Sequence, residues 1–167
     1  RPTPTKSSAA SDAYKRQIEI GVPFSDPMAE GSVIQRSHER ALSSNITFSK
    51  ILTLVEELRI HNKDQPIVLM GYMNNFLSQG ENLFKKIKKA GVDGLIIVDL
   101  PYEESEFFYN KLKDIDLDLI RLISPTTPKK TIEKIVKFSS GFLYYVSFRG
   151  VTGAKLSNFK EVQDKVK

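Results

Sequence analysis

The sequence predicts an α/β fold built around a parallel sheet, and two observations support this prediction. Five short apolar segments alternate along the chain with longer segments in which apolar residues recur at helical spacing. Most of the five short segments are apolar almost throughout, which is typical of parallel strands covered on both faces. The intervening helices then provide right-handed crossovers. The pattern alone leaves the sheet open or closed into a barrel, because a complete eight-fold barrel takes about 250 residues.

Each predicted element rests on its own residues. The strands are expected at 18–22, 67–72, 94–100, 118–123 and 141–148, and the helices at 32–42, 48–58, 83–90, 107–112 and 126–138. Gly91 follows the third helix as a natural C-cap. Thr127 is expected to cap the last helix, with Pro128 in its first turn. Phe107 and Val136 are expected to belong to the apolar stripes that face the core.

Composition narrows the class of protein. The chain has 167 residues, which suits one domain, and a net charge of +5 spread mostly over lysines on predicted helices. It lacks the arginine clusters and interleaved aromatic residues expected of nucleic-acid binding. The absence of cysteine excludes disulfides and thiolate metal sites and is compatible with a cytoplasmic location. His38 and His61 have no metal-ligand spacing, and we interpret both as ordinary helix residues.

The N-terminal segment differs from the rest of the chain. Residues 1–17 are polar, rich in Pro, Ser, Thr and Ala, and without periodicity. We expect a disordered or foreign tail there, followed by one domain over 18–167. No apolar run approaches the roughly 18 residues that a membrane span requires, so no membrane association is expected.

Polar residues near the carboxyl ends of the predicted strands mark a candidate site. Tyr72 follows the second strand, Asp99 closes the third, and Tyr144 lies in the fifth. In parallel α/β folds these ends meet on one face, where ligands bind. Structural explanations remain open at this point, because Asp99 could orient a turn and Tyr144 could be a core residue with a satisfied hydroxyl.

Glu19 is the strongest single candidate for catalysis. It lies within the apolar stretch "IEIGV", with no Lys or Arg in that strand to neutralise it. A carboxylate in such a place is costly unless it is paired or protonated, and burial raises the pKa of a carboxyl group into the range of a useful acid or base. We therefore expect Glu19 in a water-poor cavity. Two loops, "PFSDPMAEG" and "FRGVTGAK", could close over a ligand, and neither contains a standard nucleotide-binding motif.

Three segments resemble the tryptophan synthase alpha chain family: "IEIGVPFSDPMAEGSVIQ", "GVDGLIIVDLPYEES" and "YYVSFRGVTGAK". They occur in the family's order and spacing, from about Ile18 to Lys155. The resemblance implies a (β/α)8 TIM barrel, here an incomplete one of about five βα units corresponding to strands 2–6, without strands 1, 7 and 8. It also implies a carbon–carbon lyase of tryptophan biosynthesis, which cleaves indole-3-glycerol phosphate to indole and glyceraldehyde 3-phosphate. No cofactor and no metal are expected.

The resemblance also assigns roles to individual residues. Glu19 matches the family's catalytic glutamate, and Glu30 stands where the family usually has a catalytic aspartate. The residues expected to bind substrate are Tyr72, Asp99, Tyr144, Thr152 and Gly153. The residues expected at the interface with a tryptophan synthase beta chain, in an α2β2 heterotetramer, are Pro23, Asp26 and Met28. The alternative function is a catalytically impaired alpha-like fragment that serves as a docking module for the beta chain.

Overall fold

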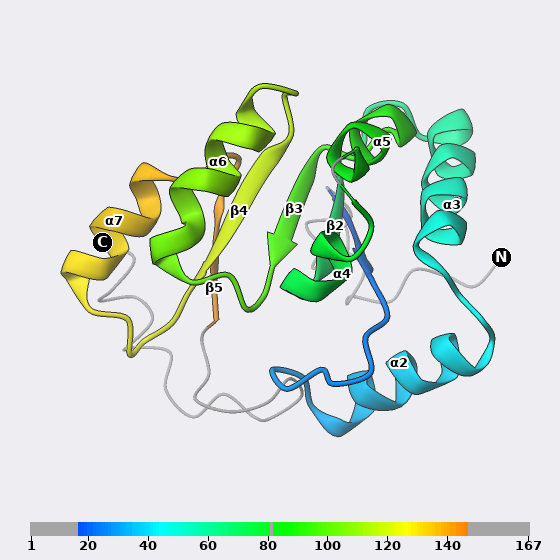
Figure 1. Cartoon of the computed structure of the whole chain (residues 1–167), viewed down its shortest axis with the longest axis horizontal. Helices are drawn as coiled ribbons and strands as arrows, with labels where there is room; N and C mark the ends of the chain where they lie inside the picture. Colours follow the sequence, from blue (N-terminus) through cyan, green and yellow to red (C-terminus); the bar gives the residue numbers. More distant parts are fainter. Residues whose placement is uncertain (1–16, 81, 147–167) are drawn as a thin grey trace, which may run out of the picture.

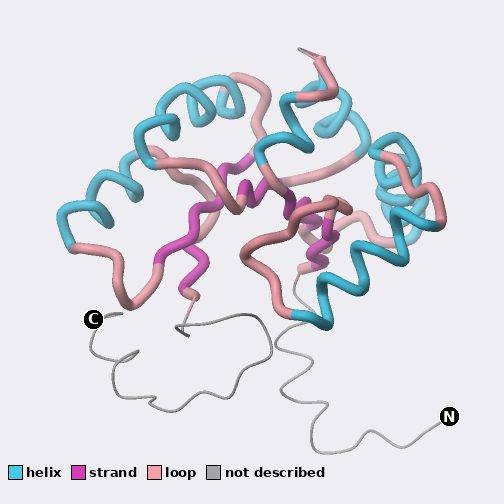
Figure 2. Tube along the Cα trace, turned by 60° about the horizontal axis from the view of Figure 1, so that its bottom comes forward, coloured by secondary structure: helices cyan, strands magenta, loops and turns pink. Residues whose placement is uncertain are grey.

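The computed structural model describes residues 17–80 and 82–146, and its centre is a five-stranded parallel sheet (Figure 1). The strands lie side by side in chain order: β1 (Ile18–Gly21), β2 (Ile67–Gly71), β3 (Gly94–Ile97), β4 (Asp118–Ile123) and β5 (Leu143–Tyr145). All four neighbouring pairs are parallel. Figure 2 shows that the sheet is curled and that helices cover its outer side. The predicted arrangement of five βα units is confirmed.

The helices follow the predicted order, with one addition. They are α2 (Ser32–Ser43), α3 (Phe48–His61), α4 (Met73–Leu77), α5 (Leu83–Ala90), α6 (Ser105–Lys113) and α7 (Lys129–Lys137), and a 3₁₀ turn, η1, covers Tyr102–Glu104. The short helix α4 was not predicted. Gly91 ends α5 with a φ of 101°, a left-handed conformation that glycine adopts without strain, so the predicted C-cap is confirmed. Among the described residues, no helix combines the length and apolar character of a bilayer span.

The main core lies between the outer face of the sheet and the helices. Ile67, Leu69, Leu95 and Leu119 point to this side from three neighbouring strands and are 0% exposed. They pack against apolar residues of α3, α5 and α6, such as Val55, Ile87 and Leu112. Burial of a side chain of this size stabilises a fold by about 1.5–3 kcal/mol. Packing on this face therefore fixes which strand residues point outward.

The inner face of the sheet carries a second, smaller apolar cluster. Val68, Ile96 and Ile120 are its buried members. Met70, Val98, Leu122 and Tyr144 are partly buried against them. In the described part of the chain, no helix contributes to this cluster. Val68, Ile96 and Ile120 are nevertheless 2%, 0% and 2% exposed, so the central strands are buried on both faces, as their apolar sequences predicted.

Several local predictions are corrected by the structure. Strand β3 ends at Ile97, before Asp99, and β5 begins at Leu143. Thr127 does not cap α7, because its Oγ1 accepts a hydrogen bond from the Ser124 N–H at 2.9 Å. Phe107 and Val136 are 60% and 49% exposed. Each adjoins a buried residue, Phe108 or Ile135, and successive side chains point about 100° apart around a helix, which turns Phe107 and Val136 toward solvent.

Arg59 joins three segments at the opposite end of the strands from the candidate site. Its guanidinium donates to the Gly91 carbonyl at 2.7 Å, to the Gln65 carbonyl at 2.6 Å, and to the Asp93 carboxylate. Asp93 in turn accepts the Ile67 N–H at 2.7 Å, at the first residue of β2. A planar guanidinium can serve these acceptors together, whereas the ammonium group of lysine cannot reproduce the fork. Arg59 therefore ties the end of α3 to the starts of β2 and β3.

We expect Arg59→Ala to lower the free energy of unfolding by about 2–3 kcal/mol, because it removes charge-assisted hydrogen bonds and leaves two carbonyls without their donor. Arg59→Lys should recover less than half of this loss. Urea unfolding followed by circular dichroism measures both variants. The control is Arg36→Ala, on the exposed side of α2, which should change stability by less than about 0.5 kcal/mol. An equal effect of Arg59→Ala and Arg36→Ala would contradict the assignment.

Candidate active site

The loop that follows β1, residues 22–31, is held at the carboxyl end of the sheet by Tyr72. The ladder between β1 and β2 closes with the Val22 N–H donating to the Met70 carbonyl at 2.8 Å. Beyond that bond, the Phe24 ring stacks on the Tyr72 ring with centroids 4.9 Å apart. The Tyr72 hydroxyl accepts the Ala29 N–H at 3.0 Å. Tyr72 is only 1% exposed, so it supports the loop from beneath and offers no open surface to a substrate.

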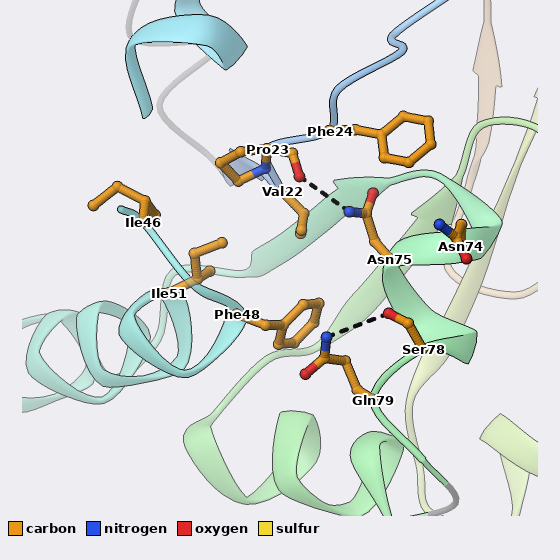
Figure 3. A pocket seen from close by; sticks show the side chains of 10 residues that line it. All are labelled: Val22, Pro23, Phe24, Ile46, Phe48, Ile51, Asn74, Asn75, Ser78 and Gln79. Atoms are coloured by element: carbon orange, nitrogen blue, oxygen red, sulfur yellow. Dashed lines mark hydrogen bonds between the residues drawn. The ribbon is translucent and has the colours of Figure 1, made fainter. Parts of the chain in front are cut away.

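Helix α4 holds the same loop from a second direction. The Asn75 side chain accepts the Tyr72 N–H at 2.9 Å and donates to the Pro23 carbonyl at 3.0 Å. Figure 3 shows this bond at the edge of a cavity of about 150 Å³ between the loop, α3 and α4. Apolar residues of the loop and of α3 line one side of the cavity, and the amides of Asn74 and Asn75 line the other.

Helix α2 contacts the loop from a third direction. The Phe24 N–H donates to Nδ1 of His38 at 2.9 Å, and the Gln35 amide donates to the Glu30 carbonyl at 2.9 Å. His38, interpreted from the sequence as an ordinary helix residue, is thus a specific acceptor for a loop N–H. No local pattern in the sequence identifies it, since Phe24 lies fourteen positions away.

Glu30 lies buried beside Tyr72 and is 7% exposed. Burial is the main cause that raises the pKa of the Tyr72 hydroxyl; the hydrogen bond from the Ala29 N–H opposes it, and the negative charges of Glu30 and Asp99 add to it. The bond from the Ala29 N–H to the Tyr72 hydroxyl brings the residue next to Glu30 to Tyr72, and Asp99 accepts the N–H of Met73, the residue that follows Tyr72. Of the polar groups predicted at the carboxyl ends of the strands, Tyr72 and Asp99 thus lie on neighbouring segments, and Glu30 of the loop lies beside them.

Glu19 points to the inner face of the curled sheet. Its Cα pairs with that of Val68, a member of the inner apolar cluster, whereas its neighbours Ile18 and Ile20 pack against the outer core. The Glu19 carboxylate accepts a hydrogen bond from the Gln17 amide at 2.6 Å, and its side chain is exposed. The expected water-poor cavity around Glu19 is therefore wrong for the described residues, because no described helix covers this face of the edge strand β1.

Comparison with known proteins places this geometry in a family. A family model described as "Tryptophan synthase alpha chain" matches residues 5–167. The chain belongs to the tryptophan synthase alpha chain family. It is 51% identical over 150 residues to the tryptophan synthase alpha chain of Janthinobacterium sp. (strain Marseille), covering 89% of this chain and 57% of that relative. It is 48% identical to that of Herminiimonas arsenicoxydans, with the same coverage.

Solved structures of the family agree with the fold. The alpha subunit of the Pyrococcus furiosus tryptophan synthase α2β2 complex superposes with a TM-score of 0.83 and 36% identity, over 95% of this chain and 64% of that one. The alpha subunit of Legionella pneumophila gives a TM-score of 0.76 and 38% identity, over 86% of this chain and 58% of that one. The sheet is therefore part of a TIM barrel of the tryptophan synthase alpha type. The chain spans about 57% of the length of the curated relatives above.

Of the remaining residues that the resemblance to tryptophan synthase alpha chains assigns to substrate binding, two lie in the described part of the chain and two lie outside it. Asp99 is exposed and accepts the N–H of Met73, the first residue of α4, at 2.6 Å, so its carboxylate binds the start of a neighbouring helix. Tyr144 is half-buried in the inner cluster, on β5 at the opposite edge of the sheet from Glu19. Thr152 and Gly153 lie outside the described residues.

The residues predicted to meet a beta chain lie along the loop. Met28 is 77% exposed, and Asp26 is exposed and accepts the Ser25 hydroxyl at 2.5 Å. Pro23 is half-buried, with its carbonyl held by Asn75. In the described part of the chain, no group of three or more His, Cys, Asp or Glu residues is arranged to hold a metal ion.

We expect Tyr72→Phe to loosen the loop and to change the dependence of stability on pH. The variant loses the bond from the Ala29 N–H, which should cost about 1 kcal/mol at neutral pH. Because the folded-state pKa of Tyr72 is raised, the unfolded tyrosine ionises first as the pH passes about 10, so the wild-type protein then loses stability. The difference between the wild type and Tyr72→Phe should therefore shrink above that pH. Urea unfolding between pH 8 and 11 measures it, and a constant difference would contradict the raised pKa.

Proposed function

We propose that this chain carries the acid–base residues of a lyase that cleaves indole-3-glycerol phosphate to indole and glyceraldehyde 3-phosphate in tryptophan biosynthesis. One observation carries the proposal. Glu19 stands on the inner face of the half-barrel beside the apolar Val68, while Glu30 is buried at the carboxyl ends of the strands. Membership of the family supports the same reaction. Two carboxylates in unlike surroundings suit a reaction that needs one to move a proton and the other to stay charged.

Glu19 performs the proton transfers in this proposal. The bond to be broken joins C3 of the indole ring to the glycerol chain, and an indole anion is a poor leaving group. The protonated Glu19 carboxyl donates a proton to ring C3, which gives the indolenine in its N-protonated, positively charged form. The resulting carboxylate then removes the proton of the C3′ hydroxyl, the aldehyde forms, and the electrons of the broken bond return to the ring as indole departs. Glu19 ends protonated, as it began, so the proton count balances.

Glu30 stabilises the charge that develops on the ring. Protonation of C3 places positive charge on the indole nitrogen, and an ionised carboxylate facing the ring N–H lowers the energy of that state. Hydrogen bonds from the Ala29 N–H to Tyr72 and from Gln35 to the Glu30 carbonyl fix the backbone around Glu30 before substrate arrives. Such preorganisation avoids the cost of reorienting the group during the reaction.

The substrate completes the surroundings of Glu19. In the free chain its carboxylate is exposed to solvent. An indole ring lying over Val68, Ile96 and Ile120 would exclude water from the neighbouring carboxyl and favour its protonation. Tyr144 lies at the edge of the same apolar floor and can pack against the ring. In the same proposal, Thr152 belongs to the loop that closes the site, and the Gly153 N–H binds the substrate phosphate.

We further propose that the chain acts with a tryptophan synthase beta chain in an α2β2 assembly in the cytoplasm. The exposed Met28 and Asp26 on a well-anchored loop support the interface, since a rigid loop loses little entropy on docking. Indole is the natural product to pass between the two subunits because it is uncharged. The cysteine-free composition is in keeping with the proposed location.

We expect Glu19→Gln to reduce indole release by about 10²–10⁴-fold, because an amide can neither give nor take the required proton. The assay measures indole formed from indole-3-glycerol phosphate by the purified chain, alone and with a tryptophan synthase beta chain. Glu57→Gln, an exposed glutamate of α3, is the control and should leave the rate unchanged. Equal rates for the two variants, or no indole from the wild-type chain in either arm, would contradict the proposed lyase.

A further inference from the structure

One backbone N–H of loop 22–31 bonds to a side chain of α2 at the position where strand β2 no longer offers it a carbonyl. The last bond of the β1–β2 ladder runs from the Val22 N–H to the Met70 carbonyl. In a continuing parallel ladder the next inward donor, the Phe24 N–H, would reach the Tyr72 carbonyl. Strand β2 ends there, and the Tyr72 carbonyl accepts the Asn75 N–H at 2.9 Å instead. His38 Nδ1 supplies the acceptor that Phe24 then needs, at 2.9 Å.

Two side chains of α2 hold the two ends of the loop. His38 accepts from Phe24 near the start of the loop, and Gln35 donates to the Glu30 carbonyl near its end. Residues three apart on a helix lie on the same face, so one face of α2 makes both bonds. Tyr72 and Asn75 hold the same two regions from the sheet side, through Ala29 and Pro23. The position of Glu30 is therefore set from both sides.

Among the described residues, little apolar burial fixes helix α2 in this position. None of its residues is buried, and Val33 and Leu42 are 60% and 40% exposed. Its N-cap residue, Gly31, makes no side-chain capping bond. Apolar burial thus contributes little to the position of α2. The hydrogen bonds that His38 and Gln35 make to the loop therefore contribute more to the position of this helix than they would in a helix packed on the core.

We propose that His38 is a positioning residue for Glu30: by accepting the Phe24 N–H at Nδ1, and with Gln35 on the same helix face, it holds loop 22–31 in the geometry that the reaction needs. The inference rests on the proposed lyase function. His38 does not touch the substrate and acts through the loop. A shift of about 1 Å in a catalytic group can cost roughly 10²-fold in rate, so the loss of such a clamp affects kcat more than binding.

The test uses the position of the acceptor atom within the side chain. In His38→Asn the amide oxygen stands close to the place of Nδ1 and can accept the Phe24 N–H; in His38→Gln it stands closer to the place of Nε2 and cannot. His38→Ala has no acceptor. The control is His61→Ala, the other histidine of the chain, which is exposed at the end of α3.

Two measurements distinguish the hydrogen bond between Phe24 and His38 from the proposed lyase activity. The first readout is amide hydrogen exchange of Phe24, followed by NMR on the ¹⁵N-labelled chain. The exchange rate should rise about fivefold or more in His38→Ala and His38→Gln, which is the effect expected from the loss of one hydrogen bond. It should stay within about twofold of the wild-type rate in His38→Asn and His61→Ala. Indole release should fall in the same order, with kcat reduced about 10–100-fold in His38→Ala at little-changed KM, and largely restored in His38→Asn.

Each other outcome overturns a defined part of the inference. An unchanged exchange rate of the Phe24 amide in His38→Ala would show that His38 does not hold the Phe24 N–H. Faster exchange without loss of kcat removes the positioning role, as does equal activity of His38→Asn and His38→Gln. A wild-type chain that releases no indole while Phe24 exchange follows the predicted order overturns the proposed lyase, and with it the role of His38 toward Glu30, although the hydrogen bond itself is then established.

Discussion

Packing of the helices against the outer face of the sheet is the interaction on which the rest of the structure depends. It buries Ile67, Leu69, Leu95 and Leu119 completely, and it also draws Ile18 and Ile20 of the edge strand outward. Because side chains alternate along a strand, fixing Ile18 and Ile20 on one face sends Glu19 to the other. A slip of one residue in the pairing of β1 with β2 would reverse all three. The direction of the proposed acid–base residue is thus a consequence of core packing several residues away.

The second carboxylate is positioned by a different kind of force. Glu30 lies on a loop that contributes little to the apolar core, and hydrogen bonds from α2, from α4 and from Tyr72 at the start of α4 hold that loop. Each bond adds only about 1 kcal/mol, so no single one dominates. Together they fix the backbone on either side of Glu30 without burying large side chains. The loop can therefore remain exposed at Asp26 and Met28, where a partner would dock, and still be ordered at Glu30.

Much of the fold was predictable because its signals are local. A few neighbouring residues are enough to predict the strands at 67–72 and 118–123 and the helix C-cap at Gly91. The features that escaped prediction depend on contacts between distant segments. Arg59 finds its acceptors about 30 positions away at Gly91 and Asp93, and His38 finds Phe24 across a loop.

Buried polar groups in the strands were also not predictable. Arg121 interrupts an apolar strand, donates to the Leu100 carbonyl at 2.6 Å, and has its pKa lowered to about 10 by burial. Its Nε has no hydrogen-bond partner in the described structure. The sequence shows an arginine among apolar residues, and nothing nearby in the sequence indicates which side of the sheet it occupies or what it meets there.

The expectation for Glu19 failed for an instructive reason. It treated the apolar neighbours of Glu19 in the sequence as its surroundings in space, yet in a strand those neighbours face the opposite side. The surroundings of the Glu19 side chain in space are its cross-strand neighbour Val68 and any group, such as a substrate ring, that covers the inner face of the sheet. Glu19 is open where burial was expected, and Glu30, whose burial was not predicted, is enclosed by protein. This order suits the proposed chemistry, since the group that must stay charged lies on backbone that hydrogen bonds hold in place, and the group that must hold a proton is desolvated only when an apolar ring covers it.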